Sequence, residues 1–229
     1  MNADLYKRAA AERALTFVEN GMRLGLGTGT TVEIFLELLA ERVRGGLTVT
    51  GTPTSKRTEE KALALDIPLD DLDSLAPLDL AVDGADEADR AFNLIKGGGG
   101  ALLREKIVAS SARRLLVIAD SSKLVERLGH FPLPVEVLPF GHATTAKRIR
   151  NAAGALGYRD SAIRLREGFL TDSGNLIYDC AFAAIKDVRL LALALAVIPG
   201  VIDHGLFLNL ATVLVIAGPN GVEVIERKA

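Results

Sequence analysis

The sequence predicts an α/β protein with an open, mostly parallel, Rossmann-like sheet and an inserted ferredoxin-like α+β domain. Two observations lead to this fold class. Over the first 130 residues, short apolar runs alternate with stretches whose apolar side chains recur at helical spacing, which is typical of a parallel sheet with helices on both faces. From about residue 131 the expected order becomes β-α-β-β-α-β, that of a small ferredoxin-like unit. We therefore expect a main α/β domain over 1–130 plus 206–229 and an inserted domain over 131–205.

The elements of the main domain follow from hydrophobic periodicity and from the glycines between the periodic stretches. Gly21 ends the first helix, and Gly45-Gly46 closes the second. The run TVLVIA (212–217) is a buried type of strand that we expect to return to the first sheet. The other expected helices and strands are helices over 3–19, 32–43, 56–65 and 101–112, and strands over 22–26, 47–50, 67–69, 78–82 and 115–119.

The inserted domain begins with PLPVEVLPF, a strand bracketed by prolines. A turn rich in Asp, Ser, Gly and Asn (171–175) indicates a hairpin between the next two strands. The other expected elements are helices over 142–155 and 187–198, and strands over 163–166, 175–179 and from 200 to 202.

The overall composition excludes several classes of protein. Of 229 residues, 49% are apolar and 24% charged, as in an ordinary globular protein, and the net charge of −2 gives no basic field for nucleic acid or an anionic membrane. Cys180 alone cannot form an internal disulfide, and the three histidines lack metal-binding spacing. The charged N-terminus lacks the apolar core of a signal peptide, and the longest apolar run (190–199) is too short to span a bilayer. We expect a cytoplasmic protein without a structural metal.

The stretch DGADEADRAFNLIKGGGGALLREK (83–106) is the main candidate for chemistry. Asp83 and Asp86 follow a buried strand, at the carboxyl edge where parallel sheets bind ligands. Lys96 precedes four glycines, whose bare amides suit an anion, and Glu105 lies just beyond. Two alternatives stay open for the aspartates, since they could bond to the backbone of a turn or hold magnesium. The glycine run could also be an ordinary flexible loop.

A second glycine-rich turn, GLGTGTT (25–31), fits a dinucleotide site badly. The third glycine of that motif falls on Thr30, and the expected acidic residue is replaced by the hydroxyl side chains of Thr52, Thr54 and Ser55. A strand-to-helix turn of glycines and threonines is better suited to phosphate. The alternative is a tight turn capped by Thr30 or Thr31.

Seven motifs occur in one order: GLGTGTT, TPTS, DGADE, KGGGGALLREK, IADSSK, FPLPVEV and IPGVIDHGLF. Together they closely resemble the type A ribose-5-phosphate isomerase family, from about Lys7 to the last strand. The resemblance implies an aldose–ketose isomerase that interconverts D-ribose 5-phosphate and D-ribulose 5-phosphate through an enediolate, in the non-oxidative pentose phosphate pathway. It implies no metal, no organic cofactor, and a homodimer or homotetramer. One departure is Thr30, where many members have serine.

The resemblance implies that Glu105 is the catalytic base and that Asp83, Asp86 and Lys96 match the family's active-site polar groups. From the chemistry of aldose–ketose isomerisation we expect Glu105 to move the carbon proton and Lys96 with nearby amides to hold the oxyanion. We expect Asp83 to open the sugar ring, and Asp86 to orient it or relay hydroxyl protons. The positions that match substrate or phosphate binding are Lys7, Thr28, Gly29, Thr30, Thr31, Gly84, Ala85, Gly97, Gly98, Gly99 and Lys123.

Two other readings compete with isomerisation. The first is a related enzyme of similar fold, such as an aminosugar-phosphate deaminase or a CoA transferase, which we disfavour because no histidine lies near DGADE in the sequence. The second is a non-catalytic sugar-phosphate sensor, for which we expect an added DNA-binding module. The first predicted helix begins almost at Met1, and the chain stops soon after the last strand, so we expect no such module.

Overall fold

The computed structural model describes residues 2–227. The described residues form two compact units. Unit 1 comprises 2–85, 104–124 and 209–227, and unit 2 comprises 86–103 and 125–208. The domain boundaries at 131 and 205 remain a prediction of the sequence.

Unit 1 is built on a six-stranded sheet in the order β13-β12-β6-β3-β1-β2. Neighbouring strands are parallel except β13, which pairs antiparallel with β12. The parallel, Rossmann-like sheet predicted from the sequence is therefore confirmed. Its strands are β1 (Arg23–Leu26), β2 (Thr50–Pro53), β3 (Leu80–Asp83), β6 (Leu115–Asp120), β12 (Ala211–Gly218) and β13 (Gly221–Glu226).

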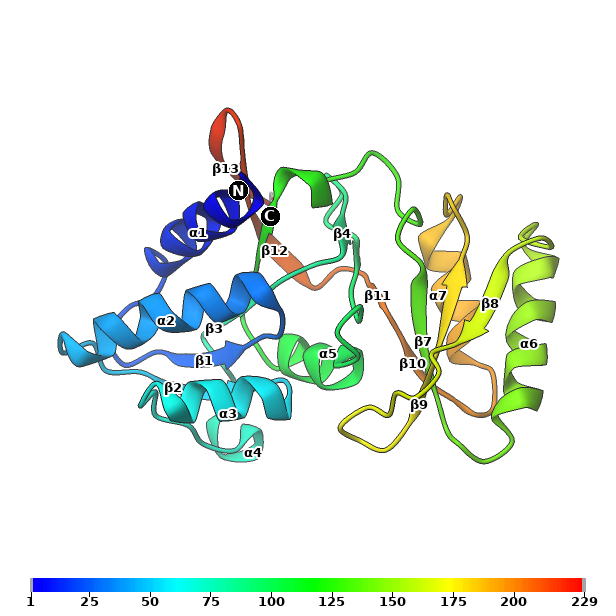
Figure 1. Ribbon diagram of the computed structural model, residues 1–229, viewed down its shortest axis with the longest axis horizontal. Helices are drawn as coiled ribbons and strands as arrows, with labels where there is room; N and C mark the ends of the chain where they lie inside the picture. The colour runs from blue at the N-terminus through cyan, green and yellow to red at the C-terminus, as the bar shows by residue number, and fades with distance from the viewer. Residues whose placement is uncertain (1, 228–229) are drawn as a thin grey trace. The chain divides into compact units, whose positions relative to one another are not determined.

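Helices cover both faces of this sheet (Figure 1). Leu24 and Leu26 of β1 pack into one core with apolar residues of α1 and α2. Gly25 points to the other face, where a Cβ would lie 2.6 Å from Val108 of α5, as the alternation of side chains along a strand requires. The helices around this sheet are α1 (Asn2–Leu15), α2 (Thr30–Arg44), α3 (Lys56–Ala64), α4 (Leu72–Leu75), α5 (Leu102–Ser110) and the short η1 (Ser121–Lys123).

Unit 2 contains an antiparallel sheet in the order β10-β7-β9-β8. In chain order its elements run β-α-β-β-α-β, so the predicted ferredoxin-like unit is confirmed. Apolar side chains of the sheet and of both helices form a single buried core. The elements are β7 (Leu133–Val137), α6 (His142–Ala155), β8 (Ala162–Leu165), β9 (Leu176–Ala181), α7 (Val188–Ala196) and β10 (Val201–His204).

A second, three-stranded sheet in unit 2 was not predicted. It comprises β4 (Glu87–Ala88), β5 (Leu94–Ile95) and β11 (Leu206–Phe207), all antiparallel. Each strand has only two residues, too few for any periodic pattern. Buried Glu87 ties this sheet to the segment before β7, because its carboxylate accepts hydrogen bonds from the backbone N–H groups of Gly129 and Phe131, at 2.7 and 2.6 Å.

Several predicted boundaries in unit 1 were wrong. The second strand was placed at 47–50 but runs over Thr50–Pro53, so half of the supposed TPTS loop is strand. The strand predicted at 67–69 is a single bridge between Leu69 and Gly51. The first helix ends at Leu15 rather than at 19. Within 2–227, no helix is both long and apolar enough to cross a membrane.

Candidate active site

Unit 1 brings four chain segments to the carboxyl edge of its sheet. Leu26 of β1 lies opposite Val82 of β3 and Pro53 of β2, and β6 runs parallel beside β3. Because the strands are parallel and in register, the residues that follow them emerge at one edge. This edge therefore carries the glycines and threonines that follow β1 and the hydroxyl residues that follow β2. It also carries Asp83 at the end of β3 and Lys123 shortly after β6.

Asp83 is the last residue of β3 and is 3% exposed. Its Oδ1 accepts hydrogen bonds from the backbone N–H groups of Thr28 (3.0 Å) and Gly84 (2.7 Å). Gly27 allows the close approach, because a Cβ there would lie 2.2 Å from this oxygen. Asp83 therefore makes the backbone bonds expected of an aspartate in a glycine turn, and these bonds fix the carboxylate in one place.

The hydroxyl groups after β2 hold the GLGTGTT turn. Thr28 Oγ1 lies 2.8 Å from both Thr54 Oγ1 and Ser55 Oγ. Thr58 Oγ1 donates to the carbonyl of Gly27 at 2.7 Å. Thr58 was missed from the sequence because it lies inside α3, and its spacing from Ser55, the N-cap residue of that helix, was the available signal.

The turn leads directly into α2, whose N-cap is Gly29 with φ 117°. The alternative that Thr30 or Thr31 caps this helix does not hold, since both are its first residues. Their position at a helix N-terminus is one where backbone N–H groups and the helix dipole favour an anion. Only Gly tolerates the φ of the N-cap without strain.

Three further predicted residues of unit 1 lie on elements that begin at the same edge. Glu105 lies in the first turn of α5 and is 4% exposed. Lys123 ends η1, directly after β6. Lys7 lies on α1, with its Nζ 3.6 Å from Asp4 Oδ1. Since α1 precedes β1 and α5 lies between parallel strands β3 and β6, both helices start at the carboxyl edge.

Unit 2 holds Asp86, Lys96 and the glycine run. Lys96 follows β5 directly and is 2% exposed, with its ammonium 5.5 Å from the centre of the Phe207 ring. Asp86 Oδ2 accepts a hydrogen bond from the backbone N–H of Gly98 at 2.7 Å. Gly97 has φ 102°. The glycine run is thus bonded to one of the candidate carboxylates.

Arg166 is a polar neighbour of the glycine run that the sequence did not reveal. Its guanidinium donates from Nη1 to the carbonyls of Gly97 (3.3 Å) and Gly98 (3.1 Å). It also pairs with Asp179. The sequence separation of 68 to 69 residues between these partners leaves no local pattern to detect.

Two histidines of unit 2 make hydrogen bonds within their own unit. His142 Nδ1 lies 2.9 Å from the hydroxyl of Tyr178, and His204 Nδ1 accepts from the backbone N–H of Leu206 at 3.3 Å. Burial raises the pKa of the Cys180 thiol well above its usual range. Among residues 2–227 there is no group of three or more His, Cys, Asp or Glu side chains able to hold a metal ion.

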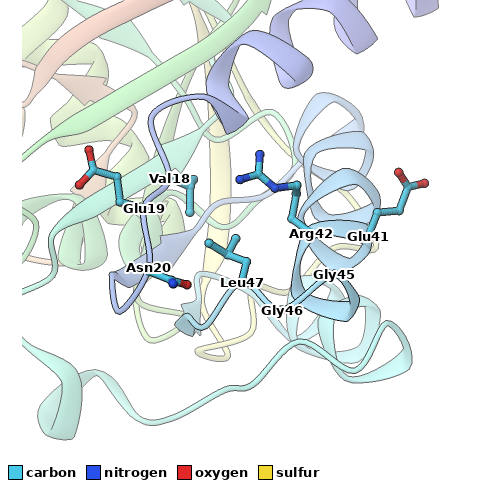
Figure 2. Close-up of a pocket in the computed structure, with 8 residues that line it drawn as sticks. All are labelled: Val18, Glu19, Asn20, Glu41, Arg42, Gly45, Gly46 and Leu47. Carbon is cyan, nitrogen blue, oxygen red and sulfur yellow. The ribbon is translucent and has the colours of Figure 1, made fainter.

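A hollow of about 490 Å³ lies at the opposite, amino edge of the unit 1 sheet (Figure 2). Its lining comes from the segments just before β1 and β2. Figure 2 shows the Arg42 side chain pointing toward Val18, while Glu41 points away. None of the candidate residues lines this hollow.

The mostly parallel sheet, with a helix N-terminus suited to an anion at its carboxyl edge, places the chain in the class of Rossmann-like α/β proteins. Comparison with known proteins is more specific. A family model described as ribose 5-phosphate isomerase A (phosphoriboisomerase A) matches residues 50–221. The chain belongs to the ribose 5-phosphate isomerase A family, which confirms the resemblance drawn from its motifs.

Individual relatives agree over the whole length. The chain is 54% identical to ribose-5-phosphate isomerase A of Parvibaculum lavamentivorans, covering 99% of this chain and 100% of that protein. It is also 54% identical to the Rhizobium rhizogenes protein of the same name, covering 99% and 98%.

Among solved structures, ribose 5-phosphate isomerase from Plasmodium falciparum matches with a TM-score of 0.93 at 38% identity, covering 99% of this chain and 100% of the other. A D-ribose-5-phosphate isomerase in complex with phospho-erythronic acid matches with a TM-score of 0.91 at 38% identity and the same coverage.

Proposed function

We propose that this chain interconverts D-ribose 5-phosphate and D-ribulose 5-phosphate, the isomerase step of the non-oxidative pentose phosphate pathway. The observation that carries the proposal is the full-length match to ribose-5-phosphate isomerases A. The burial of Asp83, Lys96 and Glu105 supports it, because charged side chains are rarely this buried without a specific role.

The reaction requires one base that acts on two neighbouring carbons. We assign this role to Glu105, whose carboxylate takes the proton from C2 of the open aldose and returns it to C1. The electrons of the broken C2–H bond form the enediolate, and negative charge develops on the oxygen of C1. A positioned base of this kind is worth roughly 10²- to 10⁴-fold in rate.

Lys96 is assigned to the developing oxyanion, together with nearby backbone amides. Its ammonium is almost fully removed from water, and a cation in a low-dielectric setting stabilises a developing negative charge more strongly than an exposed one does. The removal of one oxyanion donor from a well-studied protease costs about 2.7–4 kcal/mol, which sets the scale expected here.

The two aspartates are assigned to proton transfers at oxygen. Asp83 opens the sugar ring, a task that suits a carboxylate held by two backbone N–H groups. Asp86 orients the ring or relays protons between the hydroxyl groups. Asp83 and Glu105 belong to unit 1, and Asp86 and Lys96 to unit 2.

We assign the binding of the substrate's phosphate and hydroxyl groups to positively charged side chains and to backbone N–H groups. The start of α2 supplies amides and the helix dipole. The full set of proposed substrate-binding residues is Lys7, Thr28, Gly29, Thr30, Thr31, Gly84, Ala85, Gly97, Gly98, Gly99 and Lys123. The proposal also includes a homodimer or homotetramer, a cytoplasmic location, and no required metal or organic cofactor.

A direct assay tests the reaction and the base together. Chelator-treated protein is mixed with ribose 5-phosphate, and ketose formation is followed for wild type, Glu105→Gln and Glu60→Gln. Glu60 is an exposed glutamate of α3 and serves as the matched control. We expect rapid conversion by wild type and Glu60→Gln, and a loss of at least about 10²-fold in Glu105→Gln.

Each failure of this assay has a distinct meaning. Near-wild-type turnover by Glu105→Gln would overturn the assignment of the base. No conversion by folded wild type would overturn the reaction, and a rise in Tm with particular sugar phosphates would then identify the ligand that is bound.

A further inference from the structure

Arg166 lies just after β8 and connects a partly buried ion pair with Asp179 to the glycine run. Its Nε and Nη2 donate to the two carboxylate oxygens of Asp179, at 2.9 and 2.6 Å. Its Nη1 donates to the carbonyls of Gly97 and Gly98. Four of the five guanidinium N–H donors are thereby assigned. The side chain is 19% exposed, so its position is held by protein contacts on several sides.

The peptide between Gly97 and Gly98 links this arginine to Asp86. Arg166 donates to the Gly97 carbonyl, and the N–H at the other end of the same peptide donates to Asp86 Oδ2 at 2.7 Å. A cation on the carbonyl oxygen polarises the peptide, which strengthens the bond donated by its N–H. The hydrogen bonds to the guanidinium also fix the plane of the peptide, and therefore the direction in which that N–H points.

The loop that follows Arg166 also holds the glycine run in place, through the ring of Phe169. The Arg166 guanidinium lies 5.4 Å from the centre of the Phe169 ring. A Cβ on Gly100 would lie 2.1 Å from that ring, so the ring occupies the space that a larger residue at position 100 would need.

The same loop is anchored on β7. Glu136 is 1% exposed, and its Oε1 accepts hydrogen bonds from Thr171 Oγ1 and Asn175 Nδ2, both at 2.9 Å. A buried carboxylate with two donors from one loop holds that loop firmly, because leaving the charge without donors would cost several kcal/mol. The connection that follows Arg166 is therefore bonded to β7 through two of its residues.

We propose that Arg166 is a positioning residue for isomerisation, acting through the Gly97–Gly98 peptide to hold the Asp86 carboxylate in its working orientation. This inference rests on the role given above to Asp86. It predicts an effect on turnover rather than on substrate affinity, since Arg166 acts on the protein and most of its donors are already engaged.

A double-mutant cycle tests the inference. Arg166→Met removes the guanidinium, Asp86→Asn removes the carboxylate, and the double variant combines them. Arg164→Met is the matched control, because Arg164 lies two residues earlier on β8 and is exposed. We expect Arg166→Met to lower kcat by about 10-fold with KM changed by less than about 3-fold, whereas the same change in the Asp86→Asn background lowers kcat by less than about 2-fold.

Arg166→Lys provides a second variant if the methionine variant folds poorly. Lysine keeps the charge but lacks the planar fork that binds Asp179 and the carbonyls together. We expect a kcat between those of wild type and Arg166→Met, with Arg164→Met at the wild-type value. Circular dichroism and thermal melting establish that each variant is folded before kcat is compared.

Three outcomes would overturn the inference. They are an equal loss of kcat from Arg166→Met in both backgrounds, a rise in KM at unchanged kcat, and wild-type kinetics in a folded Arg166→Met. Each of these outcomes is read from a wild type that has isomerase activity and an Asp86→Asn variant whose kcat is reduced. A wild type without isomerase activity would instead overturn the proposed function.

Discussion

Replacement of Gly27 by alanine should damage both the stability and the chemistry of unit 1. The Cβ of alanine would lie 2.2 Å from Asp83 Oδ1 and 2.6 Å from the Asp83 Cα. Because a backbone atom is among the clashing atoms, a change of the Asp83 rotamer cannot relieve the overlap. The ends of β1 and β3 would have to separate by roughly 1 Å to reach ordinary contact distances.

The magnitude follows from the two ways in which the clash can be relieved. Overpacking that forces a backbone shift costs about 1–3 kcal/mol, and each hydrogen bond to a charged group that is lost costs about 1.5–3 kcal/mol. The Asp83 carboxylate holds two such bonds, to the N–H groups of Thr28 and Gly84. We expect a total destabilisation of about 2–4 kcal/mol, which corresponds to a fall in Tm of roughly 4–16 °C for a chain of this size.

Thermal melting and the isomerase assay measure the two effects separately. A displacement of about 1 Å at Asp83 should also lower kcat by about 10²-fold. Gly84→Ala is the control for stability, because a Cβ at Gly84 has only ordinary contacts, the nearest at 3.7 Å to the Thr28 carbonyl oxygen. A Gly27→Ala protein with the Tm and kcat of wild type would refute this reasoning.

Three further predictions concern single side chains. Thr30→Ser keeps the hydroxyl at the start of α2 and should change kcat/KM by less than about 3-fold, far less than Glu105→Gln; an effect of equal size would contradict the assigned roles. Folding lowers the pKa of Asp79 below its ordinary value of 3.8, chiefly through the hydrogen bond from the Arg23 backbone N–H, so its stabilisation is present above that pH and lost below it. Asp79→Asn should therefore reduce the free energy of unfolding by about 0.5–1 kcal/mol at pH 7, a difference that should shrink as the pH falls below 3.8, and a constant difference would count against it. Burial raises the pKa of the Cys180 thiol, so iodoacetamide at pH 8 should label only the denatured protein, and rapid labelling of the native protein would be the contrary result.

The predictions from sequence succeeded where a hydrophobic pattern was long or where a residue such as glycine clearly marked the boundary of an element. The helix predicted at 142–155 has these bounds in the structure, because its apolar spacing is regular and Gly141 precedes it. The return of 212–217 to the first sheet was also predicted correctly, because a wholly apolar run of this length must be buried. Both cases depend on information that lies within the element itself.

The failures share a different cause. β2 was misplaced because Thr52 and Pro53 resemble a loop, yet both pair with β1, and tertiary pairing overrode the local composition. β13 was missed although Pro219 and Asn220, followed by Gly221 at the first position of the strand, form a hairpin signal.

The candidate site divides in the same way between local and long-range information. Asp83, Asp86, Lys96 and Glu105 were identified from one continuous stretch of sequence. Their supports were not, because Thr58 and Arg166 reach their partners across many residues and carry no motif of their own. Sequence therefore identified the groups proposed for chemistry, whereas the side chains that orient them became visible only in the folded chain.

The strand order of unit 1 has a consequence for how the chain is made. β12 lies between β6 and β13 in the sheet, yet roughly 90 residues separate the end of β6 from the start of β12. At about 5–20 residues per second, a ribosome would need about 5–18 s to synthesise that interval. Throughout it, the apolar strand LLVIAD would present an open edge, which is a site for wrong pairing with other chains. By the end of this interval all of unit 2 would have been synthesised, so the nascent protein would complete unit 2 before unit 1. The nascent chain is therefore most prone to aggregation just before β12 and β13 are synthesised.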